Sequence, residues 1–232
     1  MNLFSRLRPS ENCDGDELDH AALLSPLQRL RQRTGSDQAA LFINEHDAFA
    51  GAMTLARKWG ERHRRGQCGV VIASGGRFDA LIESMASDVA RVPFNDLTAL
   101  NAAVDSRTVA VVLEPIQGRS VVTPASHAYV QGVASLCRAL NILLIVNEAR
   151  GTVGQHGGLL SEDTYGVRAD IVVLGDHSNR SPRSSALLAR GQACTAVIDE
   201  LAGAVQPMVP SPPRDIQHPR PQRQAQATGL MA

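Results

Sequence analysis

The sequence predicts an α/β fold, in which a mostly parallel sheet is flanked by helices. Short continuous apolar runs alternate along the chain with segments of helical periodicity, and strands that are covered on both faces read as such runs. The strands predicted in this way are 69–73, 109–113, 142–146 and 171–174, and a shorter run at 186–189 is a further candidate. Alternation of strand and helix favours helical layers packed on one sheet.

Two helices between these strands are predicted from apolar residues spaced three or four apart. One helix carries on a single face Phe49, Ala52, Met53, Ala56 and Trp59. The other carries Tyr129, Val133, Leu136 and Leu140, with Pro124 and Ser126 near its start. Asn95 or Asp96 is expected to cap a short third helix that runs to Ala103.

Composition excludes several classes of protein. Of 232 residues, 44% are hydrophobic and 20% charged, and the formal net charge is +0. This excludes a mainly disordered chain and a globally basic binder of nucleic acid. No stretch approaches the roughly 20 apolar residues that span a membrane, and the first ten residues contain no secretory signal. The four cysteines are far apart without a C-x-x-C pair, which favours reduced thiols in the cytoplasm over disulfides or a metal site.

Three segments are expected along the chain. Residues 1–38 form an N-terminal segment with one short helix, which Thr34 and Gly35 end. Residues 39–206 form the α/β region. Residues 207–232 are rich in Pro, Gln and Arg, and this composition predicts a disordered tail.

Three motifs occur in a fixed order, two at the ends of predicted strands and the third just before the strand at 171–174. Residues 113–118 read L-E-P-I-Q-G, residues 147–157 read N-E-A-R-G-T-V-G-Q-H-G, and residues 165–170 read Y-G-V-R-A-D. This series resembles the class III aminotransferases, pyridoxal-phosphate enzymes that include acetylornithine and ornithine aminotransferases. The resemblance covers about residues 39 to 190, and it implies part of the large domain of the fold-type I pyridoxal-phosphate transferases.

The family's catalytic lysine is missing from the matching position. The family's strand before this lysine ends T-L-A-K, whereas the chain has Val173, Leu174, Gly175 and Asp176 there. An imine with the cofactor aldehyde requires an amine, which aspartate does not have. No catalytic residue is therefore predicted, and a solvated or helix-capping aspartate is the expected role of Asp176.

The resemblance implies that any cofactor would contact Phe78, Gln117, Asn147 and Arg150. Asn147 replaces the aspartate that keeps the cofactor's ring nitrogen protonated, and a neutral amide does not stabilise that charge. Arg150 replaces a glutamine near the ring hydroxyl, and Phe78 is the remaining stacking face. Other roles stay open, because Gln117 also fits a tight turn after a strand and Asn147 a capped strand-end loop.

The family's phosphate-binding stretch, N-S-G-x-E, is also altered. Here Asn44 is followed by Glu45, His46 and Asp47. Carboxylates at a helix start suit the helix dipole but repel a phosphate. Lys58 is the only lysine, and a solvated helix face is its expected environment.

The expected function is that of a degenerate, non-catalytic aminotransferase-like domain that acts through subunit pairing. The partner would be a second copy or an intact aminotransferase subunit, and no nucleic acid or membrane is expected. No cofactor is expected, and pyridoxal phosphate is the compound that the scaffold would hold if it held any. The family's substrate cleft also uses a second domain, which the residues after 206 are not expected to supply. Residual acetylornithine-type aminotransferase activity, aided by a partner chain, and a decayed fragment are alternatives.

Overall fold

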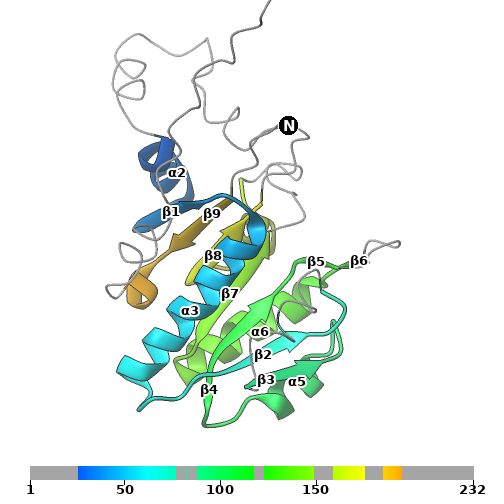
Figure 1. The fold of residues 1–232 in the computed structure, drawn as a ribbon. Helices are drawn as coiled ribbons and strands as arrows, with labels where there is room; N and C mark the ends of the chain where they lie inside the picture. The colour runs from blue at the N-terminus through cyan, green and yellow to red at the C-terminus, as the bar shows by residue number, and fades with distance from the viewer. Residues whose placement is uncertain are drawn as a thin grey trace, which may run out of the picture.

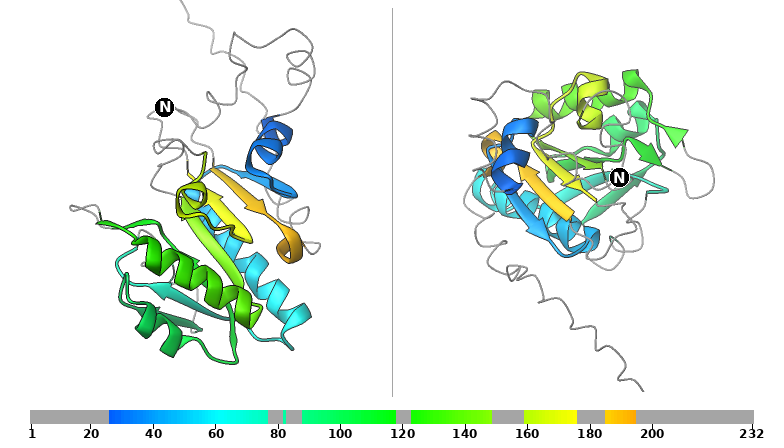
Figure 2. Two further views of the ribbon diagram at one scale, coloured as in Figure 1. Left: turned by 180° about the vertical axis from the view of Figure 1, so that it is seen from behind. Right: turned by 90° about the horizontal axis from the view of Figure 1, so that it is seen from above.

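The computed structural model describes residues 26–76, 82, 88–117, 123–148, 159–175 and 185–194. These residues form three layers, in which a seven-stranded sheet lies between two layers of helix (Figure 1). One long helix, α3 (Glu45–His63), covers one face of the sheet. The helices α5 (Leu97–Ala103), α6 (His127–Leu140) and α7 (Ser161–Tyr165) cover the other face (Figure 2).

The order of strands in the sheet is β1-β9-β8-β7-β4-β2-β3. Their bounds are β1 Gln38–Phe42, β2 Gly69–Ala73, β3 Val89–Val92, β4 Thr108–Leu113, β7 Leu143–Glu148, β8 Ile171–Leu174 and β9 Ser185–Ala189. The pairs β2–β3, β2–β4, β4–β7 and β7–β8 are parallel, whereas β9 is antiparallel to both β8 and β1. The predicted mostly parallel sheet flanked by helices is confirmed.

The direction of β9 follows from the chain length that precedes it. A parallel connection needs a crossover of roughly a dozen residues or more, usually with a helix. Only residues 175–184 separate β8 from β9, and the two strands pair antiparallel. Two strands of the seven-stranded sheet, β1 and β3, were not predicted from the sequence. A separate two-stranded ribbon pairs β5 (Ile116–Gln117) with β6 (Thr123–Pro124).

The continuous apolar runs are explained by alternation between two cores. In β7, Leu143 and Ile145 face the α3 side, while Leu144 and Val146 face the side of α5, α6 and α7. Every residue of β4, β7, β8 and β9 is buried. Burial on both faces therefore removes the polar alternation that a half-exposed strand shows.

The helices begin at the caps that their sequences suggest. Asp96, rather than Asn95, caps α5 by accepting a hydrogen bond from the amide of Ala99 at 2.8 Å. Ser126 caps α6, which ends at Asn141 in the left-handed conformation, with φ of 49°. The predicted face of α3 is fully buried, whereas Leu140 at the end of α6 is 43% exposed, because it lies in the last turn. A short N-terminal helix, α2 (Pro26–Thr34), ends before Gly35, with φ of 60°.

Among the described residues, none of the helices has the length and hydropathy that crossing a membrane requires. The expected domain bounds 1–38, 39–206 and 207–232 stay predictions. The tail and most of the N-terminal segment lie outside the described residues.

Candidate functional site

The carboxyl ends of the central parallel strands gather several polar residues at one edge of the sheet. Glu114 directly follows β4, Asn147 and Glu148 end β7, and Gly175 directly follows β8. The N-terminus of α3 meets the same edge, since Glu45 contacts Gly175. In open α/β sheets this edge is where ligands usually bind.

Asn147 and Glu114 form a buried hydrogen bond across two neighbouring strands. Leu113 pairs with Val146 in the parallel register, so the next residue of each strand comes into contact. The Nδ2 atom of Asn147 donates to Oε1 of Glu114 at 3.1 Å, and the two residues are 3% and 8% exposed. A hydrogen bond to a charged acceptor contributes about 1.5–3 kcal/mol. The amide of Asn147 is thus committed to a neighbouring side chain.

Glu114 and Gln117 hold the end of β2. The Glu114 carboxylate packs directly on Gly76, where a Cβ atom would lie 2.9 Å from Oε1. Nε2 of Gln117 donates to the carbonyl oxygen of Ala73 at 3.5 Å, and Gln117 is buried in β5. Gly75 has a φ of 87°, which favours glycine. Gln117 therefore lies in the β5–β6 ribbon next to the end of β2, and its contact with a cofactor stays a prediction.

Glu148 positions the start of α7. Its Oε1 atom accepts hydrogen bonds from the amide of Ser161 at 2.6 Å and from the Ser161 hydroxyl. A carboxylate at this place satisfies donors that a helix start leaves open. The hydroxyl of Tyr165, the last residue of α7, donates to the carbonyl oxygen of Ala125 at 3.0 Å. Burial, aided by the charge of Glu148, raises the pKa of Tyr165.

The first turn of α3 holds two carboxylates. Oδ1 of Asn44 accepts from the amide of Asp47 at 2.8 Å, while its Nδ2 donates to Oδ2 of Asp47 at 2.8 Å. The Glu45 carboxylate lies against Gly175, where a Cβ atom would be only 2.6 Å from Oε1. Side chains of the protein therefore occupy the helix start.

Comparison with known proteins shows which family has a similar sequence. A family profile described as Aminotransferase class-III matches residues 73–178. Over 182 residues the chain is 30% identical to acetylornithine aminotransferase 2 of Bordetella pertussis, covering 72% of this chain and 46% of that protein. The chain belongs to the class III aminotransferase family. It spans about half the length of the curated relatives it matches.

Other class III aminotransferases agree in sequence and fold. Acetylornithine aminotransferase of Pseudomonas putida is 48% identical over 84 residues, which are 36% of this chain and 21% of that enzyme. Ornithine δ-aminotransferase of Plasmodium falciparum superposes with a TM-score of 0.65 at 25% identity, covering 82% of this chain and 50% of that one. The ornithine aminotransferase of Toxoplasma gondii has the same score and identity, over 72% and 44%, and was solved with pyridoxal phosphate partially occupying its active site.

The structure describes two of the five class III positions singled out from the sequence. Asn147 and Gln117 lie at the same edge of the sheet, with Glu114 in contact with Asn147. Phe78, Arg150 and Asp176 lie outside the described residues. The hydrogen bond between Asn147 and Glu114 was not predicted. The predicted parallel pairing of the two strands could have indicated it, because it places the two strand ends side by side. The contact of Glu45 with Gly175 had no signal in the sequence.

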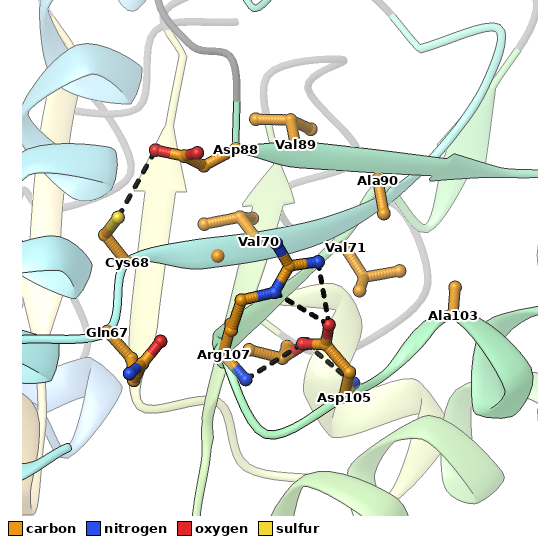
Figure 3. Close-up of a pocket in the computed structure, with 12 residues that line it drawn as sticks. Gln67, Cys68, Val70, Val71, Asp88, Val89, Ala90, Ala103, Asp105 and Arg107 are labelled. Carbon is orange, nitrogen blue, oxygen red and sulfur yellow. Dashed lines mark hydrogen bonds and ion pairs between the residues drawn. The ribbon is translucent and has the colours of Figure 1, made fainter.

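A cavity of about 230 Å³ lies at the opposite edge, beside the amino ends of β2, β3 and β4 (Figure 3). Sγ of Cys68 donates to Oδ2 of Asp88 at 3.3 Å, and this hydrogen bond is the main reason that the pKa of Cys68 is raised. Nε of Arg107 donates to Oδ2 of Asp105 at 3.0 Å, which lowers the pKa of Asp105. These charged groups on the wall of the cavity are thus already paired.

A buried ion pair joins α7 to β9 and α2. Arg190 donates through Nη1 and Nη2 to the two carboxylate oxygens of Glu162, at 3.0 and 2.7 Å. The Glu162 side chain is 0% exposed and that of Arg190 13%. Arg190 also donates to the carbonyl oxygens of Thr34 and Ala169, each at 2.8 Å. The pair therefore ties the N-terminal helix to the edge of the sheet.

Proposed function

We propose that the chain is a class III aminotransferase-like domain that catalyses no transamination and acts by pairing with another subunit. The proposed loss of transamination rests on one observation: Asp176 stands where the family has its lysine. A carboxylate cannot form the imine on which the reaction depends. Lys58, the only lysine, lies about 20 Å along α3 from Glu45 at the helix rise of 1.5 Å per residue. Its side chain is too short to substitute from there.

The residues at the carboxyl edge do not fit the cofactor of the family. A protonated ring nitrogen requires a carboxylate partner, and position 147 holds an amide whose Nδ2 bonds Glu114. A phosphate requires free amides and positive charge at a helix start, and α3 begins with Glu45 and Asp47. No catalytic step through pyridoxal phosphate is therefore derived for this chain.

Subunit pairing is supported by the family, since class III aminotransferases are generally oligomeric. We place the pairing function in residues 39–206, with 1–38 as an N-terminal segment and 207–232 as a disordered tail. A second copy and an intact aminotransferase subunit are the two partners considered. The free thiols of Cys68, Cys137 and Cys194 support a reducing compartment, the cytoplasm.

Reduction with borohydride tests the loss of catalysis. The purified chain is incubated with pyridoxal phosphate, reduced, digested and analysed by mass spectrometry, with Pseudomonas putida acetylornithine aminotransferase as the positive control. We expect no label at any residue other than Lys58. We also expect no glutamate from 2-oxoglutarate with acetylornithine as amino donor. Amino-donor-dependent glutamate would show residual transaminase activity and contradict the proposal.

Light scattering after size exclusion tests the pairing. We expect a dimer of the purified chain, or a one-to-one complex after co-expression with an intact acetylornithine aminotransferase from the same organism. A matched sample with an unrelated protein of similar size controls for non-specific association. A monomer in every one of these samples would rule out the pairing function.

A further inference from the structure

Glu45 and Gly175 contact one another at the edge of the sheet where β8 ends and α3 begins. A Cβ atom on Gly175 would lie 2.6, 2.9 and 3.1 Å from Oε1, Cδ and Cγ of Glu45. The end of the Glu45 side chain therefore covers the Cα of Gly175. Gly175 is buried, and its backbone leads directly into position 176.

The packing of α3 on the sheet fixes this contact. Phe49, one turn after Glu45, is 0% exposed and shares a core with Val173 of β8. Glu45 is the first residue of α3, and Gly175 directly follows β8, so both elements end at the same edge of the sheet. The backbone elements that bring the pair together are thus held by the core rather than by the pair itself.

The first turn of α3 carries acidic side chains. Glu45 and Asp47 are acidic residues of the first turn, and the amide of Asp47 is already used by Oδ1 of Asn44. Helix starts attract anions through open amides and the positive end of the dipole. Here Asn44 already holds the amide of Asp47, and two acidic residues lie in the same turn, so a bound anion would meet like charge at short range.

This chain differs from the family pattern at positions 45 and 175, where one side chain is larger and the other smaller. The residue before the family's lysine is alanine, whereas this chain has glycine at position 175, and the small residue after Asn44 is glutamate at position 45. A methyl group lost at one position makes room for the carboxylate at the other. We infer that Glu45 and Gly175 form a complementary pair, in which the Glu45 carboxylate excludes phosphate compounds from the start of α3. This inference rests on the proposed loss of the cofactor site and names a residue that maintains it.

The exclusion of phosphate is tested in a chain whose lysine has been restored. Asp176→Lys is compared with Glu45→Ser/Asp176→Lys and with the control Glu61→Ser/Asp176→Lys, which removes an exposed glutamate from the other end of α3. Each protein is incubated with pyridoxal 5′-phosphate, reduced with borohydride and analysed for label at residue 176. We expect at least tenfold more label when Glu45 is replaced than in the other two proteins. Equal labelling, including none in all three, would overturn the inference.

The complementary volume is tested by stability, which needs no cofactor. Gly175→Ala must displace the end of the Glu45 side chain, so it is expected to lower the urea midpoint of the natural chain slightly and to have no effect in a Glu45→Ser background. Gly60→Ala serves as the control, because its Cβ would meet the backbone oxygen of Gln67 at 2.2 Å and should destabilise both backgrounds equally. An equal loss from Gly175→Ala in both backgrounds would show that the pair is not complementary. Transamination by the natural chain would contradict the proposed function and leave this comparison unaffected.

Discussion

The side-chain amide of Asn147 donates to the carboxylate of Glu114 across the parallel β4–β7 pair, at 3.1 Å. Both residues are buried at the edge of the sheet formed by the carboxyl ends of β4 and β7. The amide of Asn147 is therefore held in a bond with an acidic side chain of the neighbouring strand. Four predictions follow from this and from other contacts of the fold.

Restoring aspartate at position 147 alone is expected to destabilise the protein. Asn147→Asp would place two carboxylates about 3 Å apart in a buried site, where both cannot be ionised without cost. We expect a loss of about 3 kcal/mol in the free energy of unfolding, measured with urea at neutral pH. The double variant Glu114→Gln/Asn147→Asp should regain most of it, because an amide again faces a carboxylate. A fully stable single variant would contradict this coupling.

Breaking the buried pair of Arg190 and Glu162 is expected to cost about 3 kcal/mol, because the Glu162 carboxylate then stays buried with a partly exposed cation beside it. Among the described residues, Arg190→Met leaves the partly exposed Arg168 as the cation in contact with the Glu162 carboxylate. Urea unfolding should show the loss. Arg107→Met is the matched control, since its pair with Asp105 is exposed and should contribute little.

Cys137 is expected to resist alkylation while the chain is folded. Burial raises its pKa to about 12, and the residue is 2% exposed. The thiolate is the reactive form, so little of it is present at pH 8. Mass spectrometry after iodoacetamide treatment should find Cys68 modified before Cys137, and urea should remove the difference. Rapid labelling of Cys137 in the native protein would disagree with its position in the core.

Asp170 is expected to make the protein less stable as pH rises through its folded pKa. Burial raises that pKa above the ordinary value of 3.8, despite opposing hydrogen bonds and Arg190. The folded state then holds the proton more tightly than the unfolded state, so the contribution is fully present at low pH and is lost on deprotonation.

Asp170→Asn should remove this part of the pH dependence. An asparagine oxygen can still accept from the amide of Leu144, which Oδ2 of Asp170 binds at 2.8 Å. Thermal unfolding of both proteins from pH 4 to pH 8 gives the comparison. Parallel stability curves would mean that Asp170 does not titrate differently on folding.

Much of the fold could be predicted because its strands are buried on both faces. The run at 142–146 lost its polar alternation for this reason and was read as a strand of a parallel sheet. Strand β3 was missed because Ala90 and Arg91 are exposed at the sheet edge and give no apolar run. The antiparallel direction of β9 follows from the short connection after β8, but its pairing with β1 joins distant parts of the chain and has no signal in the local sequence.

The sequence predicted where in the fold the candidate site residues lie, but not which of their side chains touch. Order along the chain placed Asn147 and Gln117 at strand ends, and the structure puts both at the same edge. Which side chain meets which depends on register and on how α3 crosses β8. The contact of Glu45 with Gly175 arises from that packing, so no local pattern could reveal it. Phe78, Arg150 and Asp176 stay predictions.

The placement of β9 has a consequence for synthesis of the protein. Strand β1 hydrogen-bonds only to β9 within the described sheet, and the bond from Arg190 to Thr34 joins residues 156 positions apart. While a ribosome is still making residues 185–190, β1 and β8 each lack the neighbour that lies between them, and α2 lacks its anchor. Assembly of this side of the sheet must therefore wait for the last strand, and a nascent chain paused before it would present open strand edges to chaperones.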